Sequence, residues 1–413
     1  MQAIILCEVY SIYKSRRPPL QFSKTFEDVY RNLSEDAEAL NPETASPFND
    51  SSMQTATAPP DEYSEYQAAG MVLNQDAKCK QRMLIACYIL DQQHAILFGR
   101  QRTSCLSLLG MNLPFSRSQR YWDASPEEQA EVRYRRQSSG VPRYDQVYEA
   151  MSAVPSLTET AEDPHDAFRS LLLMACLTDT NHDPQALGFV SDNSPDLSPV
   201  LFAVEQTQRM RLAFHTFMLC KHTPVRDLLA VAGESWCMAE KLSSQNDYES
   251  AQVEALHWAR AFTEPGFGFA SDKEPSSVEH ALYHARQILD IHNHHPRTGL
   301  LFQQWSIYLA SVVVWARAYA IGIEPRQEPS PPIPNTNNSP VSTRELKQTV
   351  MAFVRSEPTV TLTWSIARNI LLWSKTKIEE VDIQHNCGLT NGALDVLGKL
   401  VSRGNEQGWF GDV

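Results

Sequence analysis

The sequence predicts an all-α protein, a large irregular bundle of antiparallel helix pairs joined by loops rich in proline and serine. Apolar residues recur at i, i+3, i+4 and i+7 in many segments, as expected for helices that bury one face. Glycine is scarce, with 16 residues against 25 prolines, which favours helices with proline-containing joints over a β-sandwich. A chain of 413 residues, 42% hydrophobic and 21% charged, has the composition of a globular protein with a large core.

The apolar periodicity defines the expected elements. We expect helices over residues 1–13, 22–40, 64–98, 163–178, 199–221, 224–241, 248–263, 276–292, 300–323, 343–355, 361–375 and 391–403. Residues 41–61 have few large apolar side chains and predict a mobile loop, and 324–342 predict a proline-rich linker. The expected organisation is therefore a helical domain over 1–323, the linker, and C-terminal helices over 343–413 that pack back on the bundle.

A further helix is expected to begin at Ser125. Ser125 has a good N-cap side chain, Pro126 fits the first helical position, and Glu127 and Glu128 place negative charge in the first turn. The motif therefore predicts where this helix starts.

The most informative stretch is Arg82–Arg100, the predicted end of a long buried helix. Its apolar residues share one face at helical spacing, and Gly99 stands where a left-handed cap would stop the helix. Asp91 lies within this apolar run, where an unpaired carboxylate would be costly. We expect Arg82 or Arg100 to pair with it.

Leu90-Asp91, followed after seven residues by Gly99-Arg100, resembles the middle homology region of fungal transcription factors. Here Gln101 replaces the proline that usually follows in that region. Leu113-Pro114 and the later Trp122 are similar to a second shared segment, found in the subgroup that carries Cys2His2 zinc fingers. A third match opens the chain. It comprises residues 2–6, Tyr10, Ser23, Phe26 and Tyr30, which look like that subgroup's first helix pair.

This resemblance implies a nuclear, all-α regulatory domain that controls transcription through co-regulators or a small-molecule effector, and a homodimer is compatible with it. In the family, zinc belongs to a separate DNA-binding module that we do not find in this sequence, so we expect no cofactor here and DNA contact only through such a module. The expected explanations are a truncated gene model, a natural finger-less relative or a fragment.

Charge and cysteine usage set further expectations. The formal net charge of −13 disfavours direct binding of a phosphate backbone by these residues. The eight cysteines form no C-x-x-C pair, so zinc-finger spacing is absent, and most fall in apolar helical runs typical of reduced core residues in an intracellular protein. No uncharged apolar run is long enough to cross a membrane, so we expect no membrane-spanning helix.

A few residues carry potential chemistry. His280 and His284 lie four apart, but they lack the adjacent glutamate of a metalloprotease motif, so we expect two polar surface histidines rather than a metal site. Cys220 and His222 point apart on one helix, which disfavours a cysteine hydrolase. Residues 292–295 contain three histidines, which predict a helix end where imidazolium would favour the helix dipole, with a metal-binding tract as the alternative.

Two alternatives to a regulatory domain remain. An all-α enzyme would be revealed by a deep pocket with convergent titratable groups. A helical protein-interaction scaffold would be a superhelix of regular helix pairs with an open concave face. The resemblance favours the regulatory domain and a non-enzymatic role.

Overall fold

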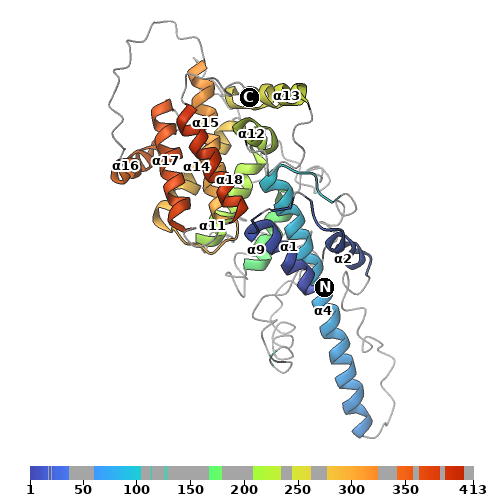
Figure 1. Ribbon diagram of the computed structural model, residues 1–413. Helices are drawn as coiled ribbons and strands as arrows, with labels where there is room; N and C mark the ends of the chain where they lie inside the picture. The colour runs from blue at the N-terminus through green and yellow to red at the C-terminus, as the bar shows by residue number, and fades with distance from the viewer. Residues whose placement is uncertain are drawn as a thin grey trace, which may run out of the picture. The chain divides into compact units, whose positions relative to one another are not determined.

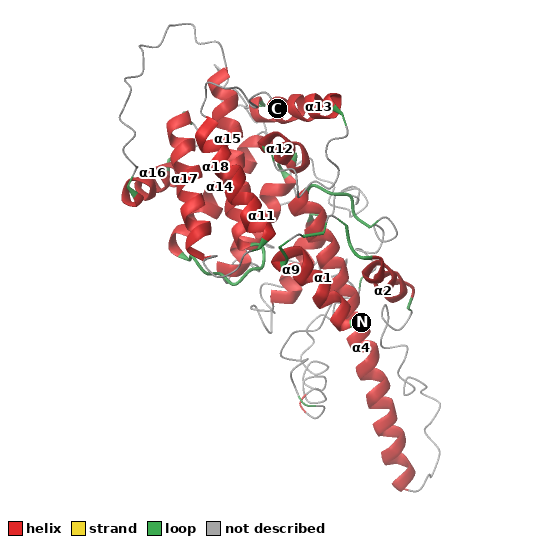
Figure 2. Cartoon of the chain, in the orientation of Figure 1, coloured by secondary structure: helices red, strands yellow, loops and turns green. Residues whose placement is uncertain are grey.

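The computed structural model describes the chain in segments. These are residues 1–16, 18–19, 21–36, 60–103, 113, 125, 128, 167–178, 208–233, 244–261, 277–323, 342–356, 362–381 and 387–403. The elements in them are helices, with no strand among the described residues (Figure 2), and the predicted all-α fold is confirmed. The helices are α1 (Gln2–Lys14), α2 (Lys24–Glu35), α4 (Pro60–Phe98), α9 (Ala167–Leu177), α11 (Gln208–Lys221), α12 (Val225–Ala232), α13 (Gln245–Arg260), α14 (Ser277–His294), α15 (Gln303–Ile323), α16 (Thr343–Arg355), α17 (Trp364–Val381) and α18 (Gly388–Arg403).

The chain divides into two compact units that alternate along the sequence. The first contains residues 1–9, 21–95 and 101–210, and the second contains 10–20, 96–100 and 211–413. Helices α1, α4 and α11, which are labelled in Figure 1, each contribute residues to both units by their residue ranges.

The core of the first unit is built on α2 and α4. Phe26 and Tyr30 of α2 are fully buried, with ring centroids 6.0 Å apart. Phe22, just before α2, stacks on Phe26 at 4.6 Å and also contacts the ring of His94 in α4 at 4.6 Å. The contact between Phe22 and His94 joins the start of α2 to α4, which is mostly buried from Leu84 to Ala95.

The second unit is organised around α15. This helix is buried from Trp305 to Ala320, as its strongly apolar sequence predicts. Helices α12, α13, α14, α17 and α18 all pack against it. Within this packing, the Ser311 hydroxyl donates a 2.6 Å hydrogen bond to the Ser374 hydroxyl of α17, so this polar pair is satisfied in the interior.

Local capping rules explain several helix starts. The hydroxyls of Ser23, Ser244 and Ser342 each accept a hydrogen bond from the backbone N–H three residues later. Ser125 and Glu128 form the reciprocal pair of a capping box, because the Ser125 N–H donates to the Glu128 carboxylate and the Glu128 N–H donates to the Ser125 hydroxyl. The hydrogen bonds expected of an N-cap at Ser125 are therefore present, and the helix predicted to follow lies, apart from Glu128, outside the described residues.

Several predicted boundaries are wrong. Helix α2 ends at Glu35 rather than residue 40, because Asp36 takes an extended conformation. Helix α12 ends at Ala232 rather than 241, because Gly233 adopts a left-handed conformation with φ +89° and its N–H caps the helix. Helix α4 begins at Pro60, inside the end of the predicted loop. Residues 41–59 of that loop and 324–341 of the predicted linker lie outside the described residues.

The C-terminal helices pack within the second unit. Helix α16 contacts α14 and α17, and α18 contacts α15 and α17.

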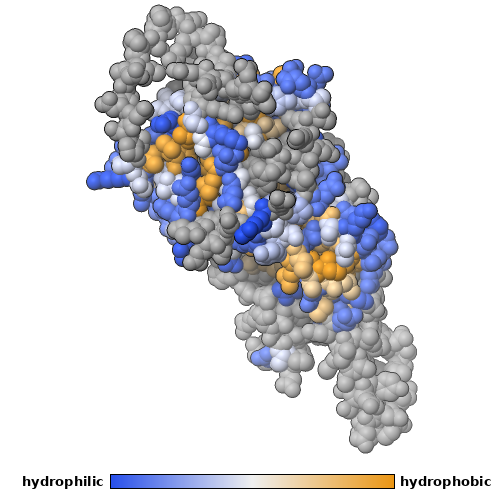
Figure 3. Space-filling view, viewed as in Figure 1, coloured by the Kyte–Doolittle hydropathy of each residue, from blue (hydrophilic) through white to orange (hydrophobic). Residues whose placement is uncertain are grey.

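On the surface, apolar side chains gather over α1 (Figure 3), where Met1, Leu6 and Tyr10 are exposed. No helix in the described part of the chain has an apolar stretch sufficient to span a bilayer.

Candidate functional site

The structure separates the residues that carry the family resemblance. Leu90 and Asp91 are buried in the first unit, whereas Gly99 and Arg100 follow the end of α4 in the second. Leu113 belongs to the first unit and is fully buried. The remaining predicted motif residues, Pro114 and Trp122, lie outside the described part of the chain.

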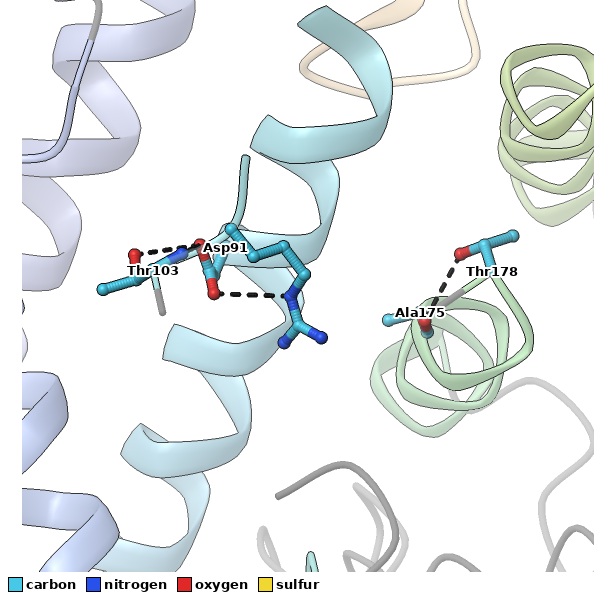
Figure 4. Close-up of polar contacts among 5 residues, drawn as sticks. Asp91, Thr103, Ala175 and Thr178 are labelled. Carbon is cyan, nitrogen blue, oxygen red and sulfur yellow. Dashed lines mark hydrogen bonds and ion pairs between the residues drawn. The ribbon is translucent and has the colours of Figure 1, made fainter. Parts of the chain in front are cut away.

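Asp91 lies at the centre of a buried polar cluster in the first unit. One carboxylate oxygen, Oδ1, accepts hydrogen bonds from the backbone N–H and the hydroxyl of Thr103, at 3.2 and 3.1 Å. The other oxygen, Oδ2, lies 3.5 Å from Nε of Arg102 (Figure 4). The segment after α4 thus returns along the helix and places a cation and two donors beside the buried carboxylate.

The arginine that pairs with Asp91 is therefore Arg102, and the prediction of Arg82 or Arg100 is wrong. Arg82 instead lies over the ring of Phe168 in α9, at 5.1 Å. The left-handed turn at Gly99 explains the error, because it reverses the chain after α4 and brings residues 102 and 103 back to the helix.

Three further side chains surround these residues, and we call the whole group the Asp91 cluster: Asp91, Arg102, Thr103, Tyr30, Cys87 and Tyr88. The guanidinium of Arg102 lies over the ring of Tyr88 at 4.9 Å, a cation–π contact. Burial raises the pKa of the Cys87 thiol to about 12, with the Asp91 carboxylate acting in the same direction. Burial likewise raises the pKa of the Tyr30 phenol.

The charge balance of the cluster is uneven. Burial raises the pKa of Asp91 above its ordinary value, although Arg102 and the two Thr103 hydrogen bonds act in the opposite direction. The free-energy cost of removing the carboxylate from water therefore exceeds the stabilisation that Arg102 and Thr103 provide. Burial therefore favours the protonated thiol of Cys87 and the protonated phenol of Tyr30 near neutral pH.

Gly99 has a requirement of its own in the second unit. Its φ of +62° lies in the left-handed region, and a Cβ placed on it would come within 2.5 Å of the backbone nitrogen of Arg226. Only glycine fits this close approach to Arg226 of α12 without a shift. Next to it, Arg100 lies over the ring of Phe98 at 5.6 Å, and Phe98 contacts Trp305 of α15 at 5.3 Å.

The third resembling segment also has structural roles in the first unit. The Ser23 N–H and hydroxyl both donate to the buried carboxylate of Glu8, at 2.9 Å each. The same hydroxyl accepts from the Phe26 N–H and caps α2. Ser23 therefore anchors the start of α2 to α1, and Phe26 and Tyr30 fill the core.

A second polar cluster, missed by the sequence analysis, lies in the second unit between α11 and α14. We call it the histidine cluster: His215, His222, His280 and His284. His215 and His284 face each other with their Nδ1 atoms 2.9 Å apart. His222 stacks on His280 at 4.7 Å and lies nearly parallel to His284 at 6.2 Å. The Trp258 indole and the Ser277 hydroxyl both donate to the His222 carbonyl, which holds that turn in place.

The imidazoles of His215, His222 and His284 are held in their neutral form. Burial lowers the pKa of His215 to about 4, with the nearby charge of Arg211 acting in the same direction. Burial also lowers the pKa of His222 to about 4, and His280 and Lys221 contribute to that shift. The pKa of His284 is lowered too, again because of burial and then of its histidine neighbours. The expectation that His284 lies at the surface is wrong, because it is buried against α11.

His222 stacks on its histidine neighbours, and no three His, Cys, Asp or Glu side chains in the described segments are placed to hold a metal ion. The nearby Cys220 thiol is fully buried, which raises its pKa and keeps it protonated. His292 does not act as an imidazolium at the helix end, because it is buried, burial lowers its pKa to about 3, and it hydrogen-bonds the Ser306 hydroxyl at 3.0 Å.

A scan against protein-family models, a search of curated proteins and a search of solved structures each returned no match for this chain.

The sequence contains no adequate signal for Arg102, Thr103 or His215, and it singles out His222 only beside Cys220 and not as a neighbour of His280 and His284. Residues 102 and 103 follow the predicted helix, and their return to Asp91 depends on the conformation of Gly99. His215 and His284 are 69 residues apart, so their contact depends on how two helices pack. A partial signal lies in the apolar periodicity of α11, which places His215 among buried neighbours.

Proposed function

We propose that this chain is the regulatory region of a fungal zinc-finger transcription factor. It would act in the nucleus and control transcription through co-regulators or a small-molecule effector, and DNA would be reached through a separate zinc-binding module. It would act by holding partner surfaces in defined states and not by transforming a substrate.

The observation that carries this proposal is the structural use of the resembling residues. Asp91 is the buried centre of a polar cluster, and Gly99 occupies a position where a side chain would collide with Arg226. A chance similarity would not be expected to fall on positions with such strict requirements. Ser23, Phe26 and Tyr30 strengthen the argument because they join α1, α2 and α4 in the same unit.

The packing of the second unit disfavours the interaction-scaffold alternative. In a solenoid, each repeat contacts only its neighbours in sequence. Here α15 contacts α12, α13, α14, α17 and α18, which lie before and after it in the chain. A single central helix with partners of this kind is typical of a globular domain.

The proposal is tested by fusing the full chain to a heterologous DNA-binding domain and measuring transcription of a reporter gene. We expect the fusion to change transcription, upward or downward, relative to the DNA-binding domain alone. The Asp91→Ala variant should lose this effect, and Asp28→Ala, at an exposed acidic position of α2, should keep it. A fusion protein present at normal levels that leaves the reporter unchanged would refute the proposed function.

A further inference from the structure

The second unit contains a pocket of about 300 Å³ where several helix ends meet. Its walls come from the end of α1, the loop before α15, the first turn of α15, the end of α17 and the start of α18. This volume lies at the lower end of the range of small-molecule sites, so the pocket suits a compact ligand.

The charged groups that the described residues contribute to the pocket wall are positive. Lys14 and Arg297 line it, and no described aspartate or glutamate is among the lining residues. Both side chains are exposed, and neither forms an ion pair with an acid in the described segments. On a chain with a formal net charge of −13, two such cations at one pocket form a local site for an anion.

The helix ends do not determine whether the pocket prefers an anion or a cation. The first turns of α15 and α18 present backbone N–H groups toward the region, but α1 and α17 end there and contribute carbonyl groups. These contributions oppose each other. The preference for an anion therefore comes from the two side-chain cations.

Three other polar side chains of the wall, those of Gln303, Cys387 and Trp305, are held by hydrogen bonds within the protein. The Gln303 side chain accepts from the Thr298 N–H and hydroxyl and donates to the Pro296 carbonyl, so it fixes the loop that carries Arg297. The Cys387 thiol donates to the Tyr13 carbonyl at 3.0 Å, and the Trp305 indole donates to the Leu97 carbonyl at 2.8 Å. A ligand would therefore meet a preorganised wall that presents two cations.

Part of the remaining lining is apolar. Leu300, Val381, Leu389 and Ala393 contribute aliphatic surface to the pocket. Inorganic phosphate would leave this surface unused, whereas an uncharged apolar molecule would leave the cations unused. A guanidinium and a carboxylate match in geometry, since two parallel N–H groups face two oxygens.

We propose that this pocket binds a small carboxylate with a short apolar chain. Arg297 and Lys14 hold the carboxylate at the mouth, and the chain lies against Leu389 and Ala393. This deepens the proposed function by naming the chemical class of the effector. Only the effect of the ligand on transcription rests on the proposed function. Binding itself does not, because it is measured on the isolated chain.

Hexanoate is a suitable probe for the experiment. Isothermal titration calorimetry of the full chain should give a dissociation constant of about 1 mM or lower for hexanoate. Hexan-1-ol, which lacks the charge, and inorganic phosphate, which lacks the chain, should each bind at least about tenfold more weakly. Hexanoate should also raise the melting temperature, since a ligand that binds only the folded chain stabilises it.

Charge-removing variants locate the site. Arg297→Gln and Lys14→Gln should each weaken hexanoate binding by about tenfold, with the melting temperature of the free protein unchanged because both side chains are exposed. Arg368→Gln is the matched control, because it removes an exposed cation from the first turns of α17, far along that helix from Val381.

Three results would overturn the proposal. They are no detectable hexanoate binding at about 10 mM, equal binding by the double variant Lys14→Gln/Arg297→Gln, and tighter binding of phosphate than of hexanoate. An inactive reporter fusion whose isolated chain still binds hexanoate would refute the regulatory role and leave the site intact. A fusion that is active while the isolated chain does not bind would do the reverse.

Discussion

Oδ2 of Asp91 lies 3.5 Å from Nε of Arg102, and the two side chains are only 1% and 7% exposed. A pair so nearly dehydrated has weak value as a source of net stability, because desolvation offsets the attraction between the charges. Burial raises the pKa of Asp91 despite the cation beside it, which points the same way. The folded chain therefore binds the Asp91 proton more tightly than the unfolded chain does. Ionising Asp91 thus costs stability as the pH rises from its ordinary pKa through the higher folded value.

The first prediction concerns what happens when one partner is removed. Asp91→Ala should lower the free energy of unfolding by about 3 kcal/mol, because it leaves the Arg102 guanidinium buried without its carboxylate. Arg102→Met alone should lower the free energy of unfolding by a similar amount, because it leaves the Asp91 carboxylate buried without its cation. The double variant should be less destabilised than either single variant, since it leaves no buried charge of this pair and keeps an aliphatic side chain over Tyr88.

Urea denaturation of the four proteins measures this cycle. Asp28→Ala, an exposed aspartate on α2, is the control and should unfold close to the wild-type midpoint. If the two single-variant losses add up in the double variant, Asp91 and Arg102 act independently and the pair has no structural importance.

The second prediction separates two reasons for glycine. Gly99→Ala should destabilise the chain by about 3 kcal/mol, because it combines a left-handed φ of +62° with a collision against the Arg226 backbone. Gly233→Ala provides the comparison, since Gly233 has φ +89° and a Cβ added there would meet no heavy atom of the described residues within 4 Å. It should cost only about 1 kcal/mol, from the backbone conformation alone.

The difference between the two melting temperatures reports the contact between Gly99 and α12. Equal losses for Gly99→Ala and Gly233→Ala would mean that α12 moves away without cost, and the close approach at Gly99 would then lend no support to the family resemblance.

The sequence predicted the helices that have a strong apolar period. It did not predict boundaries that depend on the backbone conformation of a single residue. Helix α16 begins and ends as predicted because Ser342 caps it and its apolar face is regular. Helix α12 is shorter than predicted because an apolar period does not reveal that Gly233 turns left-handed. The sequence therefore allowed a helix end to be located only where a side chain with a strong capping preference marked it.

For the candidate sites, the sequence located the special residue but not its partner. Asp91 was conspicuous as a carboxylate among apolar residues, whereas Arg102 depends on the path of the chain after Gly99. The histidine cluster was harder to predict, because His215 comes from α11 and His284 from α14. The four-residue spacing of His280 and His284 shows only that they share one face of α14. Whether that face is buried depends on the helix that packs against it.

The third prediction is a loss of stability in acid that originates in the histidine cluster. His215 has a folded pKa of about 4, below its unfolded value near 6.5, so the unfolded chain binds its proton more readily. The contribution of His215 is fully present above pH 6.5 and is lost as the pH falls toward 4. A shift of this size corresponds to about 3 kcal/mol for His215, and His284 and His222 act in the same direction.

The measurement is the free energy of unfolding between pH 7.5 and pH 4.5, in the wild-type chain and in His215→Asn/His284→Asn. The wild type should lose stability below about pH 6.5, and the double variant should show a shallower loss because it cannot take up those protons. His295→Asn, at an exposed position, should keep the wild-type slope. Parallel profiles for wild type and double variant would show that other groups govern acid unfolding.

The fourth prediction concerns Ser23, whose hydroxyl has two hydrogen-bond partners. It caps α2 through the Phe26 N–H at 3.2 Å and also donates to the buried Glu8 carboxylate at 2.9 Å. Ser23→Ala should cost about 2 kcal/mol, because an N-cap is worth about 1 kcal/mol and Glu8 also loses a donor in a buried site.

Ser342 is the matched control for Ser23. It caps α16 in the same way through the Glu345 N–H, but its hydroxyl donates to no carboxylate among the described residues, so Ser342→Ala should cost only about 1 kcal/mol. Glu8→Ala combined with Ser23→Ala should cost less than the sum of the two single losses, since both remove the same hydrogen bond. Equal losses at Ser23 and Ser342 in urea denaturation would show that the link from α1 to α2 contributes nothing to the first unit.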